Sequence, residues 1–379
     1  MKKILHVVNV SFVIPSFFGN QFKYLKDKSI ESHLICSPSE DVVYLAQKYD
    51  FKYKQINIKR SVSIKDDFFA IKEICNYIKQ NKIDIVVGHT PKGALLSMIA
   101  GIIANVDKRI FFRHGLVYET TMGFKRVLLK NIERITSFLS TCVICVSPYL
   151  LEKSIEDHLS IRKKMIVLNR GSCNGVDAEC IFNPCLIHRS KLEDLKKKYN
   201  ISDRSFVIGF TGRVSKDKGV EDLIETFLLL QKKYNEVKLL IIGPLDERIG
   251  ISEKYIEIIQ NNKDIISTGL IKDNLQYYYA LMDLFILPTH REGFGNVILE
   301  ASAMKLPVLT TSHTGSRDAI INGITGFYVN LSPYDIASTT RRYIESEELM
   351  HEHGINGRNF VLNNFSEKII WSELEKIYL

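Results

Sequence analysis

Short runs of apolar, β-branched residues alternate with longer helical patterns along nearly the whole chain, and this alternation constrains the fold most strongly. The runs in the first half are residues 4–10, 32–36, 53–58, 84–88, 109–113 and 142–147. Those in the second half are residues 206–211, 238–242, 265–268, 284–288, 308–311 and 326–329. Continuous apolar strands separated by helices, such as those predicted over residues 64–80 and 92–104, are typical of parallel sheets covered on both faces. The sequence therefore predicts an α/β fold of two doubly wound domains.

The length of 379 residues also favours two domains. A proline and a run of charged residues interrupt the alternation over residues 183–198. We therefore place the N-terminal domain at residues 1–185 and the C-terminal domain at residues 186–358. The last segment, residues 359–379, ends in an amphipathic helix with Trp371 on its apolar side, so it is free to pack outside the second domain.

Composition narrows the class of protein, because 45% hydrophobic and 25% charged residues are ordinary for a globular chain. The net charge of +8 suits anionic partners such as nucleotides, phosphates or a membrane surface. The sequence lacks the arginine-rich tracts and motifs of a nucleic-acid binder. No apolar run approaches the roughly 20 residues of a membrane span, and His6 and Asn9 interrupt the apolar N-terminal run, which favours a buried strand over a signal peptide. We expect a cytoplasmic protein without nucleic-acid partners.

The seven cysteines are irregularly spaced, which favours reduced thiols over a disulfide framework. The alternative is a zinc site formed by Cys173, Cys180, Cys185 and His188. Their spacing matches no common zinc-binding pattern. The sequence contains neither GxGxxG nor a P-loop motif, and no DxD offers a carboxylate pair to a nucleotide-bound metal. We therefore expect no metal and no tightly bound cofactor.

Two cations follow the predicted strand at residues 206–211, at the end where doubly wound domains bind ligands. Arg213 and Lys218 flank a turn that opens a helix near Gly219. Two cations beside a helix N-terminus suit a diphosphate, because the helix dipole and free N–H groups add to their charge. The alternative is a pair of ordinary solvated surface cations.

Two acids bracket a glycine loop after the strand at residues 284–288. Glu292 precedes residues 293–295, a helix is predicted to begin near Asn296, and Glu300 lies within it. The glycines let backbone N–H groups approach a ligand closely. The acids are up to about 12 Å apart along a helix axis, whereas a carboxylate pair flanking one scissile bond lies about 5–9.5 Å apart. The spacing suits two hydroxyl-bearing ends of one extended ligand, or else one capping acid and one buried acid with a local partner.

Histidines stand at the ends of two predicted strands in the first half. His114 follows residues 109–113 and precedes a glycine, and His89 has the same placement after residues 84–88. A lone histidine is often structural, but this placement makes a role in ligand binding or catalysis equally plausible. Gly19 ends the loop after the first strand and could approach a phosphate.

Four segments in this order resemble the retaining GT-B glycosyltransferases of glycosyltransferase family 4, the glycosyl transferases of group 1. They are NGVD at 174–177, GRVSKDKG at 212–219, EGFGNVILEASA at 292–303 and TGSRDAIINGITGFYV at 314–329. The resemblance covers nearly the whole chain. It implies two Rossmann-like domains that face an interdomain cleft, with a C-terminal helix crossing back onto the N-terminal domain.

The resemblance also implies how a nucleotide-diphosphate sugar is held. Arg213 and Lys218 would neutralise the donor diphosphate, and the backbone amides of Gly293, Phe294 and Gly295 would hold the sugar and phosphate.

The remaining roles concern the sugar, the ribose and the leaving group. Glu292 would meet the hydroxyls of the transferred sugar, and Glu300 those of the ribose. His114 resembles the histidine that contacts the sugar near the reacting carbon. The helix N-terminus near Asn296 would help to stabilise the leaving diphosphate, and no metal is implied.

Three positions depart from the family pattern. Gly19 is the single glycine in a loop that often has two or more, which leaves the acceptor side open. Lys305 stands where a glycine usually ends the helix, which costs about 1 kcal/mol if the position is left-handed. Asp318 replaces a glutamate, which is a mild change.

The expected reaction moves a hexose or N-acetylhexosamine from a nucleotide-diphosphate sugar, with a UDP-sugar favoured, to a glycan or lipid-linked saccharide in capsule or O-antigen synthesis. The rivals are a sugar-nucleotide epimerase of the same architecture and a non-catalytic nucleotide-sugar-binding protein. The basic, amphipathic segment at residues 122–140 is consistent with contact at an anionic membrane, which would place the protein at the inner face of the plasma membrane. It is also consistent with an ordinary domain helix that has a solvated basic face.

Overall fold

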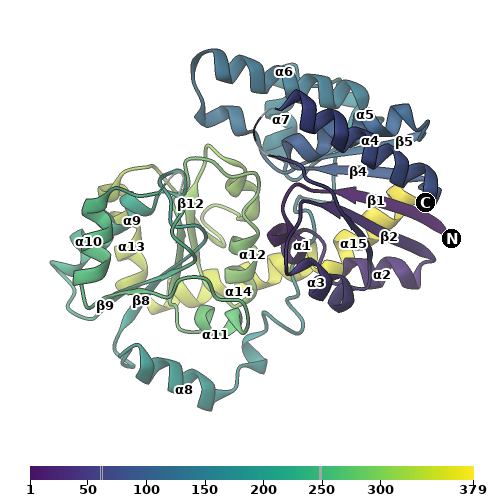
Figure 1. Ribbon diagram of the computed structural model, residues 1–379. Coiled ribbons are helices and arrows are strands. Elements are labelled where there is room, and N and C mark those ends of the chain that lie inside the picture. Colours follow the sequence, from purple (N-terminus) through teal and green to yellow (C-terminus); the bar gives the residue numbers. More distant parts are fainter. Residues whose placement is uncertain (60, 62, 247–249) are drawn as a thin grey trace. The chain divides into compact units, whose positions relative to one another are not determined.

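The strands of the computed structural model, which describes residues 1–59, 61, 63–246 and 250–379, form two parallel sheets (Figure 1). Unit 1 comprises Met1–Gly175 with Glu367–Leu379, and unit 2 comprises Val176–Ser366. The chain therefore leaves unit 1 after Gly175, ahead of the boundary placed at residue 185. It returns at Glu367, so the first part of the segment at residues 359–379 belongs to unit 2.

The sheet of unit 1 has the strand order β3-β2-β1-β4-β5-β6-β7, with all neighbours parallel. The strands are β1 (Lys2–Val7), β2 (Ile30–Cys36), β3 (Lys52–Gln55), β4 (Ile85–His89), β5 (Lys108–Arg113), β6 (Cys142–Cys145) and β7 (Met165–Val167). The predicted strands of this half are confirmed, including a buried strand at the N-terminus, and β7 is an additional edge strand. The order reverses between β1 and β4, where a doubly wound sheet opens a ligand-binding crevice.

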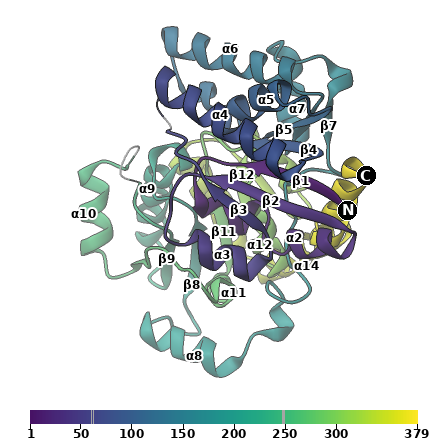
Figure 2. The same ribbon diagram turned by 45° about the vertical axis from the view of Figure 1, so that its right-hand side comes forward.

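Helices cover both faces of this sheet (Figure 2). They are α1 (Ile14–Phe17), α2 (Gln21–Asp27), α3 (Val42–Tyr49), α4 (Ile64–Asn81), α5 (Pro91–Ile103), α6 (Gly123–Leu139), α7 (Pro148–Glu156) and α15 (Glu367–Tyr378). The predicted helices at residues 64–80 and 92–104 are confirmed as α4 and α5. Ser63 is the residue before α4, and acids of the first turn reach back to it: its hydroxyl donates to Asp66 at 2.6 Å and its amide donates to Asp67 at 3.4 Å.

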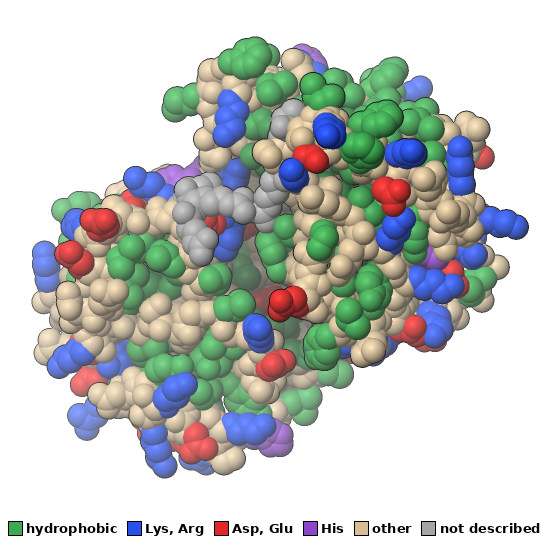
Figure 3. All heavy atoms as spheres, viewed as in Figure 1, with side chains coloured by type: hydrophobic (Ala, Val, Ile, Leu, Met, Phe, Trp, Pro, Cys, Tyr) green, Lys and Arg blue, Asp and Glu red, His purple; other side chains and the backbone are tan. Residues whose placement is uncertain are grey.

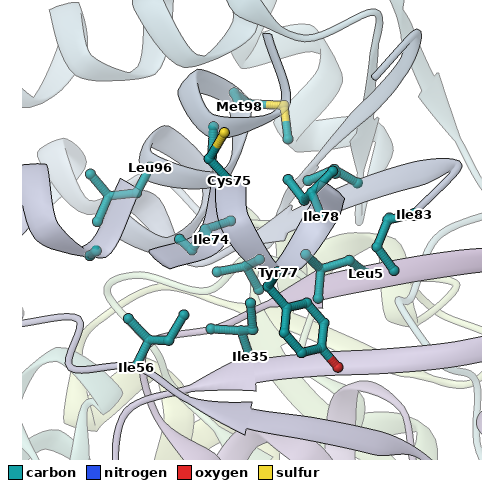
Figure 4. Packing of buried hydrophobic residues seen from close by; sticks show 14 of the residues in the cluster. Leu5, Ile35, Ile56, Ile74, Cys75, Tyr77, Ile78, Ile83, Leu96 and Met98 are labelled. Carbon is teal, nitrogen blue, oxygen red and sulfur yellow. The ribbon is translucent and has the colours of Figure 1, made fainter. Parts of the chain in front are cut away.

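Two apolar cores lie on opposite faces of the sheet, because neighbouring residues of a strand point to opposite sides. The core under α4 and α5 is shown in Figure 4 and includes Leu5, Ile35, Ile74, Ile78, Leu96 and Met98. The core under α1, α2 and α3 includes Val8, Ile14, Phe18, Phe22 and Leu34. Helix α15 packs against α2 in unit 1, where the Nε1 of Trp371 donates to the Oδ1 of Asn174 at 2.8 Å.

The sheet of unit 2 has the strand order β10-β9-β8-β11-β12-β13 and is also parallel. The strands are β8 (Phe206–Thr211), β9 (Val237–Ile242), β10 (Ile265–Ser267), β11 (Leu284–Leu287), β12 (Val308–Thr311) and β13 (Gly326–Val329). The helices are α8 (Arg189–Lys198), α9 (Val220–Gln231), α10 (Glu253–Asn261), α11 (Leu275–Tyr279), α12 (Asn296–Ala303), α13 (Pro333–Ile344) and α14 (Glu347–Asn364). The prediction of two doubly wound, Rossmann-like domains is confirmed. Within the described ranges, no helix combines the length and the apolar character needed to cross a membrane.

Lys305 ends helix α12 in the left-handed conformation that the sequence raised as a source of strain. Its φ is 63°, its amide donates to the Ser302 carbonyl at 3.0 Å, and the Leu306 amide donates to Ala301 at 3.0 Å. Glycine is favoured at such a helix end because it has no Cβ.

We expect Lys305→Gly to raise the free energy of unfolding by up to about 1 kcal/mol, because it removes the strain of a left-handed Cβ. In a thermal melt this corresponds to a gain of roughly 2–4 °C. Lys305→Ala is the control, since it keeps the Cβ and should give no such gain. Equal melting temperatures for the two variants would contradict the strain at this residue.

Candidate functional site

The two segments singled out in the second half of the sequence come together at one point of unit 2. Strand β8 lies beside β11, and the strand order reverses between them. Gly219 has a φ of 70°, and a Cβ there would lie 1.8 Å from the Pro288 carbonyl oxygen. The Thr289 hydroxyl donates to the Asp217 carbonyl at 3.1 Å. The loops after β8 and β11 are therefore in direct contact at the switch point, where open α/β sheets bind ligands.

Lys218 and Glu292 form an ion pair across these two loops. The Nζ of Lys218 lies 2.5 Å from the Oε2 of Glu292, and both side chains are largely buried. The other carboxylate oxygen of Glu292 accepts from the Gly293 amide at 3.1 Å, and the Glu292 carbonyl accepts from the Gly315 amide at 2.9 Å. A Cβ on Gly315 would lie 2.0 Å from the Gly293 carbonyl oxygen, so the glycine loop is packed too closely for a side chain there.

Arg213 is held by the carboxylates of Asp217 and Asp246. Its guanidinium bonds to Asp246 and lies 3.5 Å from the Oδ2 of Asp217. Asp217 also accepts from the Ser215 hydroxyl at 2.6 Å and from the Nη2 of Arg291 at 2.9 Å. Burial by itself raises the pKa of Asp217, but the Ser215 hydroxyl and the cations around it lower that pKa further than burial raises it. Asp217 is therefore a buried anion that orients two guanidinium groups.

The glycine loop leads into helix α12 at the predicted residue. Gly295 has a φ of 88° and precedes Asn296, the first residue of the helix. The side chain of Phe294 is buried against Phe365, with ring centroids 5.4 Å apart, so only its backbone can contact a ligand. The helix N-terminus adds partial positive charge at the end of the loop whose Glu292 pairs with Lys218, which favours an anion there.

Glu300 has the local partner that its apolar surroundings require. The Tyr279 hydroxyl donates to its Oε2 at 2.7 Å. Desolvation raises the pKa of the Glu300 carboxyl from its ordinary 4.5 to about 7, although the bond from Tyr279 lowers it. Near neutral pH this carboxyl is therefore divided between its protonated and ionised forms.

The raised pKa of Glu300 makes stability depend on pH. Between about pH 4.5 and 7 the folded chain keeps a proton that the unfolded chain releases, so stability falls as pH rises through this window. We expect Glu300→Gln to remove this loss. The melting temperature of the variant minus that of the wild type should therefore increase from pH 5 to pH 8, by roughly 2–4 °C for each kcal/mol of stability that the wild type loses. Melting curves at both pH values measure this, and a difference that does not change with pH would contradict it.

The candidate site residues predicted in the first half of the sequence, the two histidines and Gly19, lie in unit 1. His114 follows β5, its ring is stacked on Phe17 at a centroid distance of 3.8 Å, and its Nε2 lies 2.9 Å from the Nδ1 of His89. Gly19 has a φ of 47°, and its amide donates to the Ile14 carbonyl at 3.1 Å. That amide is therefore already engaged at the end of the α1 turn.

Several residues of these clusters were not expected from the sequence. Asp217 and Asp246 hold Arg213 in unit 2, Arg291 is a further cation paired with Asp217, and Tyr279 is the partner of Glu300. Arg291 and Asp217 carried a signal, because they adjoin Glu292 and Lys218 in the sequence. Asp246 and Tyr279 carried none, because they meet Arg213 and Glu300 through contacts between segments that are distant in sequence.

The structure does not support the zinc alternative. Cys173 lies in unit 1, whereas Cys180, Cys185 and His188 lie in unit 2. No group of three or more His, Cys, Asp or Glu side chains among the described residues is arranged to hold a metal. All seven cysteines are free thiols.

Comparisons with known proteins match both halves of the chain. Residues 192–360 match the family of glycosyl transferases group 1, and residues 3–147 match the glycosyl transferase 4-like family. The chain is 36% identical over 379 residues to the capsular polysaccharide biosynthesis glycosyltransferase CapM of Staphylococcus aureus, covering 100% of this chain and 97% of that protein. It is 23% identical over 350 residues to the UDP-Gal:alpha-D-GlcNAc-diphosphoundecaprenol alpha-1,3-galactosyltransferase of Escherichia coli, covering 91% and 88%.

Solved structures share the fold of the whole chain. A glycosyltransferase from Rickettsia africae superposes with a TM-score of 0.82 at 24% identity, over 100% of this chain and 97% of that one. Anabaena Alr3699/HepE in complex with UDP-glucose superposes with a TM-score of 0.82 at 17% identity, over 100% and 99%. With more than a third of its residues identical to those of a glycosyltransferase along its full length, this chain belongs to the glycosyl transferases of group 1 and has the GT-B fold.

Proposed function

We propose that this glycosyltransferase moves a hexose or N-acetylhexosamine from a UDP-sugar to a glycan or lipid-linked saccharide during synthesis of a capsular or O-antigen polysaccharide. The observation that carries the proposal is the cluster of cations and the helix N-terminus at the switch point of unit 2. Glu300 lies within the same helix, α12. The names of CapM and of the Escherichia coli galactosyltransferase, and the UDP-glucose bound to the Anabaena protein, support the polymer, the acceptor class and the donor.

The donor diphosphate binds to Arg213, Lys218 and the amides at the start of α12. In the ligand-free chain Lys218 is paired with Glu292 at 2.5 Å. A diphosphate that takes over Lys218 releases Glu292 to accept hydrogen bonds from the hydroxyls of the sugar. Glu300 accepts hydrogen bonds from the ribose hydroxyls. The two acids therefore bind different ends of the same donor.

Transfer proceeds with retention at the anomeric carbon. The bond from this carbon to the diphosphate oxygen breaks, and a bond to the acceptor oxygen forms on the same face. The leaving diphosphate takes the acceptor's proton. Arg213, Lys218 and the helix N-terminus stabilise the negative charge that develops on the diphosphate, which is preorganised electrostatic catalysis. The reaction needs no protein nucleophile and no metal, in keeping with a sequence that lacks a DxD motif.

A transfer assay with the full chain tests this proposal. Radiolabelled UDP-sugars are incubated with lipid-linked saccharide acceptors, and the anomeric configuration of the product is read by NMR. We expect an α-linked product from an α-configured donor, formed equally well in a chelator. An inverted product would contradict retention. An epimerised sugar nucleotide formed from donor alone would identify an epimerase, and donor binding without any turnover would identify a binding protein.

The acceptor side includes an anionic membrane surface, which α6 contacts. Helix α6 and the residue before it expose several apolar side chains, which are Met122, Phe124, Val127, Leu128, Ile135 and Phe138. Phe124 is 82% and Phe138 80% exposed, beside the exposed cations Lys125 and Arg126. In Figure 3, hydrophobic and basic side chains lie next to one another at the top of the view, over α6. Exposed aromatic rings among cations are typical of interfacial helices on anionic lipid.

Vesicle flotation tests the membrane contact. We expect the full chain to float with anionic phospholipid vesicles at low salt and to be released as salt screens the attraction. The double variant Phe124→Ser with Phe138→Ser should lose flotation, whereas Tyr334→Ser, at a 75% exposed aromatic residue of unit 2, should keep it. A wild-type chain that stays with the unbound fraction at low salt would overturn this part of the proposal.

A further inference from the structure

Three histidines form a continuous chain of imidazoles in unit 1. His6 lies on β1, His89 ends β4 and His114 follows β5, and these three strands are neighbours in the sheet. The Nδ1 of His6 lies 3.1 Å from the Nε2 of His89, and the Nδ1 of His89 lies 2.9 Å from the Nε2 of His114. The chain thus runs from the interior of the sheet to the histidine that the sequence placed at the sugar.

Aromatic rings enclose this chain. Phe18 lies edge-on to both His6 and His89, at centroid distances of 4.9 and 4.8 Å, and Phe112 is stacked on His89 at 5.2 Å. His6 and His89 are 0% and 2% exposed. Burial lowers the pKa of His6 and of His114 to about 3 each, and it lowers the pKa of His89 in the same direction. All three rings are therefore neutral, and each carries one proton.

With one proton on each ring, the two contacts must run in the same direction along the chain. In one direction His6 donates to His89 and His89 donates to His114. In the other direction His114 donates inward, and the last proton falls on the Nε2 of His6. That atom is buried and has no hydrogen-bond partner within the part of the chain that the structure describes. A buried N–H without an acceptor is rarer than a buried acceptor without a donor, so the outward direction is favoured.

We propose that His6 and His89 are positioning residues that fix His114 as the tautomer with its proton on Nδ1, so that it presents a neutral N–H donor to an oxygen of the transferred sugar. Phe17 completes the positioning, because its ring lies parallel to that of His114 within 3°. The identity of the oxygen rests on the proposed function, but the tautomer does not. A neutral donor also suits an oxocarbenium-like transition state, because a cationic imidazolium near the reacting carbon would repel the charge that develops there.

NMR of the full chain labelled with ¹⁵N in its histidines tests the tautomer directly. Two-bond proton–nitrogen correlations distinguish the two neutral tautomers and the charged form. We expect His6, His89 and His114 to be neutral between pH 6 and 8, each with its proton on Nδ1. A wild-type His114 that carries its proton on Nε2, or that is charged in this range, would overturn the proposal whatever the chain's activity is.

Variants of His89 separate positioning from a merely structural role. His89→Phe keeps a ring of similar size but no nitrogen, so we expect His114 to lose its single tautomer and kcat to fall about tenfold, the rate equivalent of one net hydrogen bond. His89→Asn keeps an N–H close to the place of Nδ1 and should restore the tautomer and much of kcat. His33→Phe is the control, because His33 is buried in the same sheet but bonds to Tyr77 and Glu31.

Each outcome has a defined meaning. If His89→Phe and His33→Phe lower kcat equally and leave the tautomer of His114 unchanged, His89 has only a structural role and the proposal falls. If the tautomer shifts in His89→Phe but no variant, and not the wild type, transfers a sugar, the positioning holds and the proposed function falls.

Discussion

Arg213→Ala is expected to lower turnover with the true donor by about 10²- to 10³-fold, the loss typical of removing one donor that stabilises developing negative charge. The protein should still fold, because the side chain of Arg213 is 41% exposed and Arg291 continues to neutralise Asp217. Steady-state kinetics with a UDP-sugar and its acceptor measure this loss. The effect should fall mainly on kcat, because the charge on the diphosphate is greatest in the transition state.

A neighbouring cation supplies the matched control. Lys216 begins the same turn, η5 (Lys216–Lys218), but it is 64% exposed and lies 3.8 Å from Glu221. Lys216→Ala should leave kcat and KM close to their wild-type values. Near-normal turnover of Arg213→Ala, or equal losses in both variants, would remove Arg213 from the diphosphate site.

The two acids of the glycine loop should give different defects. Glu292→Gln should lower kcat by about 10²-fold, because Glu292 both meets the transferred sugar and pairs with Lys218 at 2.5 Å. Glu300→Gln should mainly raise the donor KM, by about tenfold at pH 8, since the variant replaces charged hydrogen bonds to the ribose with neutral ones. Kinetics at varied donor concentration separate the two effects.

The pH profile adds a signature that belongs to Glu300 alone. Its pKa is about 7, so the wild-type donor KM should fall as pH rises from 6 to 8 and the carboxyl becomes an ionised acceptor. In Glu300→Gln this dependence should disappear, while Glu225→Gln, at a surface acid paired with Lys254, should keep it. A kcat defect in Glu300→Gln that matches that of Glu292→Gln would contradict the separate roles.

The strands and the loop positions of the site were predictable because their signals are local. Parallel strands that are buried on both faces read as short apolar runs, and ligands bind beyond their carboxyl ends. The start of α12 at Asn296 follows from the glycines before it, whereas the strain at Lys305 was raised by the family resemblance, in which a glycine usually ends this helix. Strand β7 gave no such signal, because it has three residues and only Met165 is fully buried.

The partners of these residues were not predictable because they depend on contacts between distant segments. The need of Glu300 for a partner could be read from its apolar neighbours, but Tyr279 is brought to it by the packing of α11 on α12.

The domain boundary lies earlier than predicted, and Arg358 shows why. Its guanidinium donates to the carbonyls of Phe182 and Ala178 at 3.1 and 3.0 Å, which holds this segment in unit 2.

The imidazole chain shows the same limit. His6 interrupted an apolar run and His89 stood at a strand end, and neither position indicated the other. The register between β1 and β4 pairs His6 with Val87, which brings His89 within reach, and β5 then adds His114. Register is a property of the folded sheet, so single residues can be suspected from sequence while their connection cannot.

A crystal structure of this chain with UDP bound tests the donor site most directly. We predict that the diphosphate lies within hydrogen-bond distance of Arg213, Lys218 and the first amides of α12, and that the ribose hydroxyls lie against Glu300. Lys218 should by then have exchanged Glu292 for phosphate. UDP bound elsewhere, or bound while Lys218 and Arg213 remain on Glu292 and Asp246, would contradict the site described for unit 2.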